Sequence, residues 1–363
     1  MKRILQIVPR VPGGVDGVGD YALNLAAKLR EKFGYATVFA AADAPRSTMV
    51  SDFEVRRLDQ LNRVQEFDRM LLHYVNYGYQ ARGVPFGLLS SLRRMRQQHS
   101  GKLLTVFHEL YASGSPWSSA FWLRPLQIYL TKSVARLSDV CIASSENFAR
   151  ELRRLAPKSQ VHLHPTPSGL EEPSLSREQI VERDPHRWVI VGGTVLAERS
   201  LRSFVRARQW IPESIVPRKL FVLGGSENPM TRLLLADLGI ESDYRPQIGA
   251  TEASEILRMC SYTWINYFHR PDVDTAVILK SSAFAAACAH AVIPVFPHRG
   301  TPISIEGDQL PGPFWVEASC CQIPSANERS DVAAKIYGWY QQHGSSELLV
   351  TDIAEMFGLS GPR

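Results

Sequence analysis

ILQIVPRVPGGVDGVGDYALNLAAKL, residues 4–29, contains the pattern that indicates the fold class of this chain. The apolar run at residues 4–8 predicts a buried strand, and the amphipathic segment that starts at Tyr21 predicts a helix. Four glycines within seven residues lie between them. Glycine lets the backbone approach a bound group closely, and a helix N-terminus offers free N–H groups and a partial positive charge. The stretch therefore predicts a strand, a phosphate-binding turn and a helix.

The spacing of these glycines distinguishes between kinds of phosphate site. A dinucleotide-binding loop has the pattern Gly-x-Gly-x-x-Gly, whereas this loop has Gly14-x-x-Gly17-x-Gly19. Residues 36–42, which include the second predicted strand, also contain no acidic residue for a dinucleotide ribose. A plain strand-to-helix turn would need fewer glycines. We therefore predict that Gly14, Gly17 and Gly19 bind phosphate, and that the chain is not a dinucleotide-dependent oxidoreductase.

Short apolar runs alternate with amphipathic segments along the whole chain, which is typical of parallel α/β architecture. In the first half, strands are predicted at residues 4–8, 36–40, 70–75, 103–107 and 140–143, and helices at 21–31, 86–98, 120–137 and 147–155. In the second half, strands are predicted at 188–191, 220–223, 263–267 and 292–296, and helices at 201–210, 231–238 and 252–259. The end of the chain, 330–357, predicts two helices broken at residues 343–344.

The length of 363 residues suggests two domains, because single cores rarely grow beyond about 250–300 residues. The segment from His164 to Pro185 is rich in proline, serine and charged residues, as linkers are. We predict an N-terminal domain at 1–165, a linker at 166–186, a C-terminal domain at 187–345, and a last helix at 346–363 that packs back on the first domain. Two open parallel sheets bind ligands at the carboxyl ends of their strands, which suits a reaction between two substrates.

Charge is distributed unevenly along the chain. Residues 1–170 contain 23 Lys and Arg against 13 Asp and Glu, whereas the remainder contains 18 against 23. Basic helices are predicted at 90–98 and 149–155, and they are either solvated faces or contacts with anionic lipid head groups. Aromatic residues do not alternate with these arginines, so nucleic acid is not an expected partner.

The cysteines and the apolar runs indicate the compartment. Five cysteines, an odd number without a CxxC spacing, indicate reduced thiols and neither a disulfide framework nor a zinc site. The first apolar run is too short for a secretory signal, and no stretch of about 18 apolar residues predicts a membrane-spanning helix. We expect a cytoplasmic protein, peripheral to the inner face of the membrane if its basic helices bind lipid.

Several stretches, in order along the chain, resemble GT-B glycosyltransferases, particularly glycosyltransferase family 4. GGVDGVGDYALNLAAKL resembles the family's GGVG-x-Y opening, and VFHEL resembles its strand that ends in a histidine. LSDVCIASSENFARELRRL resembles its ADxVIxxSE segment, VIVGGTVLAERSLRSFVRA its VGRLxxEKGxxxLxxA segment, and KLFVLGG the next strand. The resemblance implies an α/β fold of two facing Rossmann-like domains with parallel sheets. It also implies transfer of a sugar from UDP or GDP with retention at the anomeric carbon.

The resemblance assigns roles to residues of this chain. His108 would face the donor sugar, while Arg199 and Lys280 would neutralise the leaving diphosphate without a metal ion, which is electrostatic stabilisation of developing charge. The alanine-rich helix after Lys280 opens with two serines, which could hold phosphate or act as ordinary helix caps. The expected donor- and phosphate-binding residues are Gly14, Gly17, Gly19, Gly193, Asp274, Ser281 and Ser282. The expected acceptor-side residues are Asp16, Asp20, Tyr21 and Glu109.

The chain also departs from the family pattern. Gly193 stands where the family has arginine, and Arg199-Ser200 stands where it has Lys-Gly. One alignment puts Asp274 and Ser282 in the places of the family's two glutamates, and another shifts the match by about a helical turn. Asp272-Val273-Asp274 matches the DxD metal motif of the GT-A fold. It lies late in the chain, within the second series of strands and helices, where a GT-A enzyme would not have it.

These observations predict a hexosyltransferase-type enzyme that uses a nucleotide-sugar and builds a polysaccharide or glycoconjugate. Its partners would be a UDP- or GDP-sugar and a glycan or lipid-linked acceptor, with no cofactor and no metal. The alternative is a non-catalytic GT-B-like module that binds a nucleotide or glycan and scaffolds a polysaccharide synthase complex. The missing arginine and glutamates are the observations that keep this alternative open.

Overall fold

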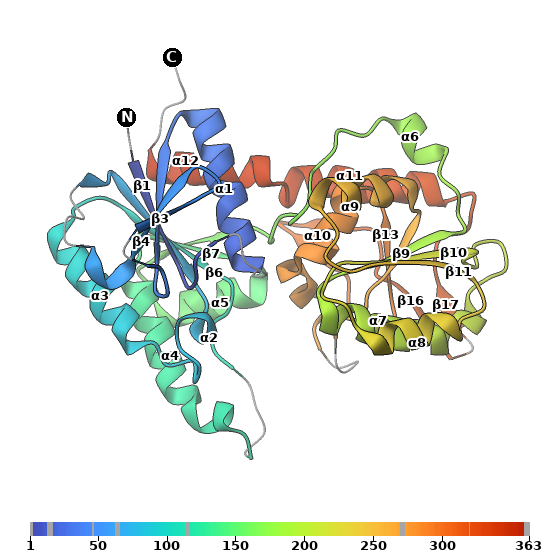
Figure 1. The fold of residues 1–363 in the computed structure, drawn as a ribbon, viewed down its shortest axis with the longest axis horizontal. Helices are drawn as coiled ribbons and strands as arrows, with labels where there is room; N and C mark the ends of the chain where they lie inside the picture. The colour runs from blue at the N-terminus through green and yellow to red at the C-terminus, as the bar shows by residue number, and fades with distance from the viewer. Residues whose placement is uncertain are drawn as a thin grey trace. The chain divides into compact units, whose positions relative to one another are not determined.

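The computed structural model describes residues 3–12, 17–45, 47–61, 66–112, 117–268, 273–318 and 320–358. The chain divides into two compact units, Met1–Pro165 with Ser346–Arg363, and Thr166–Ser345 (Figure 1). Each unit is built around one mostly parallel sheet with helices on its faces. The predicted α/β class with two Rossmann-like sheets is therefore confirmed.

The first unit contains an eight-stranded sheet with the order β3-β4-β2-β1-β5-β6-β7-β8. Its strands are β1 (Arg3–Val8), β2 (Ala36–Ala41), β3 (Ser47–Val50), β4 (Phe53–Arg57), β5 (Arg69–Tyr74), β6 (Leu103–Phe107), β7 (Val140–Ala143) and β8 (Gln160–Leu163). Neighbouring strands are parallel except for the β3–β4 pair. The carboxyl ends of the parallel strands therefore meet at one edge of the sheet.

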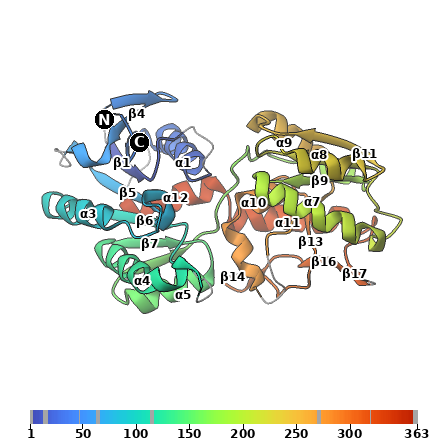
Figure 2. The same cartoon turned by 60° about the horizontal axis from the view of Figure 1, so that its bottom comes forward.

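Helices cover both faces of this sheet, which explains why its central strands are apolar on both sides. They are α1 (Gly17–Phe33), α2 (Asn76–Tyr79), α3 (Phe86–Gln98), α4 (Ser119–Leu137), α5 (Glu146–Leu155) and α12 (Ser346–Phe357), with a 3-10 turn, η1 (Leu58–Gln60). The helices α1 and α12 pack on one face, and α3, α4 and α5 pack on the other (Figures 1 and 2).

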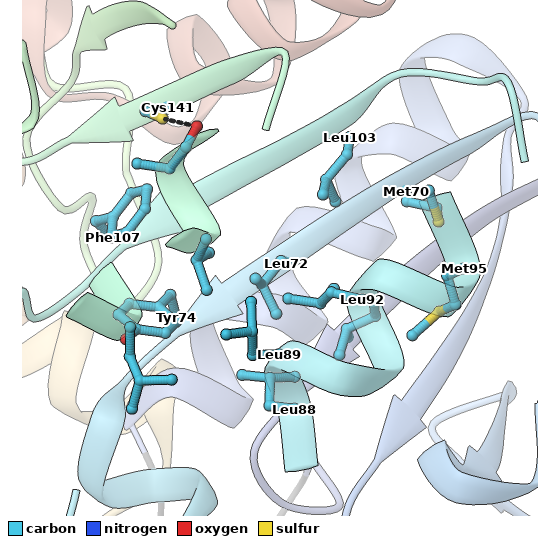
Figure 3. Packing of buried hydrophobic residues seen from close by; sticks show 14 of the residues in the cluster. Met70, Leu72, Tyr74, Leu88, Leu89, Leu92, Met95, Leu103, Phe107 and Cys141 are labelled. Atoms are coloured by element: carbon cyan, nitrogen blue, oxygen red, sulfur yellow. Dashed lines mark hydrogen bonds between the residues drawn. The ribbon is translucent and has the colours of Figure 1, made fainter. Parts of the chain in front are cut away.

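Alternate side chains of the central strands point to these two faces of the sheet. In β1, Leu5 and Ile7 join the core under α3 and α4, whereas Ile4 joins the core under α1 and α12. Figure 3 shows the inner face of α3, where Leu92 and neighbouring side chains point toward Leu72 and the rest of the sheet. The same contacts fix which face of α3 is exposed.

The second unit contains a seven-stranded sheet with the order β11-β10-β9-β12-β13-β16-β17. Its strands are β9 (Arg187–Val191), β10 (Lys219–Leu223), β11 (Glu241–Arg245), β12 (Tyr262–Trp264), β13 (Ile293–Phe296), β16 (Phe314–Glu317) and β17 (Cys320–Gln322). All neighbours are parallel except β16 and β17. A small hairpin, β14 (Ser304–Ile305) and β15 (Asp308–Gln309), stands apart from this sheet.

Helices again lie on both faces of the second sheet (Figure 1). They are α6 (Arg177–Val181), α7 (Thr194–Ala207), α8 (Pro229–Ala236), α9 (Ala250–Met259), α10 (Ser282–Ala289) and α11 (Arg329–His343), with 3-10 turns η3 (Arg208–Trp210) and η4 (Thr275–Lys280). Under α7 the rings of Trp188 and Tyr262 stack at 4.8 Å, and Phe204 meets the edge of Trp264 at 5.7 Å. These fully buried rings anchor α7 to β9 and β12.

The segment at residues 166–186, whose composition indicated a linker, packs within the second unit. Ser176 and Gln179 form a reciprocal capping box at the start of α6. Arg183 is buried and donates hydrogen bonds to the carbonyls of Cys260, His290 and Ala291 at 2.7–3.2 Å. All three bonds come from Nη1, and they tie the segment to this unit.

Two of the predicted boundaries shift in ways that affect the site. The predicted strand at 263–267 ends at Trp264, and the predicted helix at 201–210 starts earlier, at Thr194. Arg199 is therefore inside a helix. All five cysteines are free, and Cys141, Cys260 and Cys288 are buried. No helix in the described ranges combines the length and apolar character that crossing a bilayer requires.

Candidate functional site

The first unit has its topological switch point between β1 and β5. β1 pairs with β2 on one side and with β5 on the other, so the connections leave it in opposite directions. α1 begins here with Gly17, which is exposed and has open space around its α-carbon, while Gly19 is buried in the first turn. Gly14 and Asp16 lie outside the described residues.

Two histidines meet at this edge. His108 follows β6, and its Nε2 lies 3.3 Å from Nδ1 of His73 in β5. The other ring nitrogen of His73 lies 3.0 Å from Oε1 of the buried Gln6 in β1. The half-buried ring of Tyr21 in α1 meets both imidazoles edge-on, with centroids 4.9 Å from His108 and 5.5 Å from His73. Sequence analysis predicted Tyr21 and His108 and missed Gln6 and His73.

This chain of contacts sets the tautomers of both imidazoles. The amide oxygen of Gln6 only accepts, so Nε2 of His73 donates to it and Nδ1 of His73 is left as an acceptor. His108 then donates from Nε2 to His73, and its own Nδ1 remains an acceptor. Burial lowers the pKa of His108 to about 4, and burial together with the nearby His108 lowers the pKa of His73 well below its ordinary value. Both imidazoles are therefore neutral at physiological pH.

Acidification from pH 7 toward pH 4 is expected to destabilise the first unit. Between the unfolded histidine pKa of about 6.5 and the lowered folded values, the unfolded chain binds protons that the folded chain does not. The contribution of these histidines to the free energy of unfolding is therefore at its maximum above this window, and it decreases as the pH falls through the window. Thermal melts across the range measure the slope. His73→Gln should flatten it, and an equal slope in His73→Gln would contradict the assignment.

Two of the other expected acceptor-side residues lie at the same edge. Asp20 is exposed in the first turn of α1, and Glu109 is exposed directly after His108. A pocket of about 400 Å³ lies further along, lined by residues that follow the carboxyl ends of β2, β4 and β5. Its lining includes Ala42, Leu58, Asp59, Gln80, Phe86 and Ser91. The sequence pattern gave no signal for this pocket, because its walls come from separate loops.

The second unit has its switch point between β9 and β12. β9 pairs with β10 on one side and with β12 on the other, and α7 follows β9 through Gly192 and Gly193. The next loop comes very close: a Cβ on Gly225, whose φ is +69°, would meet the backbone nitrogen of Thr194 at 2.4 Å. Gly193 itself caps α7 with an ordinary φ of −64° and open space around it. Glycine at 193 is thus not required by the backbone.

Arg199 connects α7 to the segment after β12. Its Nε donates to the carbonyl of Asn266 at 2.6 Å, and its Nη2 donates to the carbonyl of Tyr267 at 3.1 Å. The neighbouring Ser200 hydroxyl accepts from the Asn266 N–H at 3.0 Å. Partial burial lowers the pKa of the Arg199 guanidinium, and Tyr267 opposes that shift. The arginine therefore lies at the switch point, where it also shapes the loop.

Lys280, Ser281 and Ser282 form the entry to α10. Lys280 is the last residue of η4 and is half-buried, and Ser282 is exposed at the first position of the helix. The buried Ser281 hydroxyl accepts from the Phe284 N–H at 3.3 Å, so it acts as a helix cap. Of the two expectations for Ser281, the structure thus shows the helix cap. The N-terminus of α10, with its partial positive charge, lies beside Lys280.

Asp274 lies at the other end of η4. Its Oδ1 accepts from the Ala276 N–H at 2.9 Å and lies 3.5 Å from the Thr301 hydroxyl. The carboxylate therefore caps this 3-10 turn. Asp272 of the DxD pattern is outside the described residues. Among the residues that the structure describes, no three or more His, Cys, Asp or Glu side chains are grouped to hold a metal ion.

Neither family models nor curated proteins match this sequence. Solved structures, however, are similar along nearly the full length of both chains. A structure of Anabaena HepE in complex with UDP and glucose has 10% identity and a TM-score of 0.58, covering 99% of this chain and all of that one. The E. coli trehalose-6-phosphate structure bound with UDP-2-fluoro glucose has 9% identity and a TM-score of 0.56, with 99% and 100% covered. WaaG, a glycosyltransferase involved in lipopolysaccharide biosynthesis, has 10% identity and a TM-score of 0.55, with 98% and 99% covered. These likenesses confirm the fold, the GT-B type of two Rossmann-like sheets.

Proposed function

We propose that this protein is a glycosyltransferase that moves a sugar from a UDP- or GDP-sugar to a glycan or lipid-linked acceptor. The observation that carries the proposal is the full-length likeness to structures that hold UDP with glucose or a fluoroglucose donor. At about 10% identity this likeness concerns the fold, so the chemistry is argued from the residues at the two switch points. The sugar transferred would be a hexose, with retention at its anomeric carbon, as the family resemblance implies.

The second unit would bind the donor. Departure of the sugar leaves negative charge on the diphosphate, and fixed positive groups lower the barrier by stabilising that charge. Arg199 at the switch point and Lys280 beside the N-terminus of α10 supply such groups. The N-terminus of α7, which Gly193 leaves open, supplies backbone N–H groups. Ser282, exposed at the entry to α10, would add a hydroxyl.

The first unit would bind the acceptor. His108 would meet the sugar as a neutral imidazole whose Nδ1 accepts a hydrogen bond from a hydroxyl. The N-terminus of α1 at Gly17 and Gly19 would hold an anionic group, and Asp20 and Glu109 would contact acceptor hydroxyls. The pocket beside η1 and α3 has room for a sugar ring of the acceptor.

A thermal-shift panel of nucleotides and nucleotide-sugars tests the proposal directly. A ligand at a hundred times its Kd raises the free energy of unfolding by about 2.7 kcal/mol, so a UDP- or GDP-sugar should raise the melting temperature clearly. NAD serves as the matched negative control. A panel in which no nucleotide diphosphate or nucleotide-sugar stabilises the protein would refute the proposal.

A non-catalytic binding module is the second candidate, because Gly193 offers no side chain where the resembled family has arginine. Both candidates bind nucleotide, so binding alone does not separate them. Release of UDP or GDP from the donor in the absence of acceptor does, since water replaces the acceptor in an enzyme. Nucleotide binding without any donor hydrolysis, with a range of sugars, would favour the module.

Chelation by EDTA is expected to leave the rate of donor hydrolysis nearly unchanged. Arg199 and Lys280 are assigned the role that a divalent cation has in metal-dependent transferases. The assay compares turnover before and after EDTA and after addition of Mn²⁺. Loss of activity with EDTA and its recovery with Mn²⁺ would shift the role to Asp274 and the DxD pattern.

A further inference from the structure

The helix α4 presents an exposed aromatic face on the first unit. Trp117, just before the helix, is 96% exposed, and Trp122 within it is 70% exposed. Leu126 and Tyr129 follow at the spacing that keeps them on the same side of a helix, and they are 42% and 48% exposed. The opposite side of α4 belongs to the core through Leu130 and its neighbours. Apolar side chains that are exposed together in this way mark interaction surfaces.

The outer side of α3 continues this face. Its inner side is buried against the sheet (Figure 3), and Phe86 at its start is 45% exposed with its ring centroid 6.5 Å from that of Tyr129. Arg93 reaches the Tyr129 hydroxyl from α3 at 3.4 Å. We call this combined surface the α4 aromatic face; it comprises Phe86, Trp117, Phe121, Trp122, Leu126 and Tyr129.

The two helices that build the α4 aromatic face contain charged residues of one sign. The sequences of α3 and α4 contain six Lys and Arg and no Asp or Glu. Arg96 pairs with Asp139, at the base of β7. The other five are Arg93, Arg94, Arg124, Lys132 and Arg136. On α5, in contrast, Arg153 and Arg154 are paired with Glu146 and Glu151 of the same helix. Of the two basic helices predicted from the sequence, α3 therefore has more positive charge that is not compensated by a carboxylate of its own helix than α5 has.

We propose that the α4 aromatic face docks on an anionic lipid surface. Tryptophan and tyrosine favour the boundary between lipid tails and head groups, because their rings are apolar with a polar edge. Arginine and lysine beside them are attracted to anionic head groups and can extend toward them. The exposed Trp117 and Trp122 match the preference of aromatic rings for this boundary. The arginines and lysine of α3 and α4, two helices without a carboxylate, match the attraction to anionic head groups.

Flotation of the full chain with lipid vesicles tests the docking surface. The protein should bind vesicles of phosphatidylcholine with phosphatidylglycerol, bind pure phosphatidylcholine far less, and dissociate as salt shortens the Debye length below about 8 Å. Trp117→Ala with Trp122→Ala should weaken binding roughly tenfold or more, since two exposed rings no longer leave water. Leu233→Ala with Met259→Ala, which shortens two exposed apolar side chains of the second unit, is the control and should bind as the wild type does.

A charge series completes the test. Arg94→Gln with Arg136→Gln should lose affinity for the anionic vesicles, whereas Arg218→Gln with Arg258→Gln removes the same charge from exposed sites of the second unit and should not. Thermal melts and UDP affinity show that each variant is folded. Vesicle binding retained by the double tryptophan variant, or equal on neutral lipid, overturns the proposal. The proposal is also overturned if the protein does not bind vesicles but forms a concentration-dependent dimer in sedimentation, and Trp122→Ala abolishes that dimer.

Discussion

Replacing Lys280 with alanine is expected to lower kcat by roughly a hundred- to thousandfold, the usual effect of removing one donor aimed at developing charge. Lys280 ends η4 directly before the capped N-terminus of α10. Its ammonium and the partial positive charge of the helix would therefore act on the same anion. The alanine variant keeps Ser281 as the cap of α10, so the helix should begin where it does now.

The measurement pairs kcat with nucleotide affinity. Free UDP or GDP should bind the folded Lys280→Ala protein more weakly than it binds the wild type, because the lysine would contact the diphosphate that both ligands contain. Lys335→Ala, which removes an exposed lysine from α11, is the control and should leave both quantities unchanged. Wild-type nucleotide affinity in folded Lys280→Ala would mean that the donor binds elsewhere.

Arg199→Ala is expected to reduce kcat on the same scale. The loss of positive charge must be separated from the structural effect of this substitution. Arg199 also donates to the carbonyls of Asn266 and Tyr267, so alanine releases the loop after β12. Arg199→Lys keeps a positive charge and loses the fork of donors. If charge alone matters, Arg199→Lys should recover much of the rate; if the loop matters, it should resemble Arg199→Ala. Arg202→Ala, one turn along α7 and exposed, is the control.

The central elements could be predicted from the sequence because burial imposes a pattern on them. β6 and β7 were predicted with their observed bounds, and α3 likewise, since each has a continuous or periodic apolar signal. The edge strand β11 was missed. Its sequence, ESDYR, is exposed or half-buried throughout and has no apolar run. An edge strand is defined by pairing with a neighbour, which a local pattern does not reveal.

The candidate site was predictable in part for the same reason. His108 follows a strand and precedes a charged residue, so its position at a carboxyl edge could be expected. Gln6 and His73 lie inside apolar strands, and only the pairing of β1 with β5 shows that they meet. Composition also misrepresented 166–186, because the contacts of Arg183 with three distant carbonyls leave no local signal.

His108→Ala is the second substitution with a large expected effect, a fall in kcat of roughly a hundredfold or more with little change in nucleotide affinity. The imidazole would contact the sugar and not the nucleotide, so its loss should affect the transition state. Because burial lowers its pKa to about 4, His108 is already neutral over the range of an ordinary assay. The wild-type rate should therefore show no inflection from His108 between about pH 5.5 and 8.

The alanine variant also leaves Nδ1 of the buried His73 without the hydrogen bond from His108, and an unsatisfied buried polar group costs about 1–3 kcal/mol. His108→Gln isolates the chemistry, since an amide can still donate to His73 but cannot present an imidazole to the sugar. His108→Gln should melt close to the wild type and remain slow. If it melts normally and turns over normally, while only His108→Ala is impaired through lower stability, His108 is a structural residue that supports His73. If both variants are folded, slow and bind UDP or GDP as the wild type does, the imidazole itself takes part in the transfer.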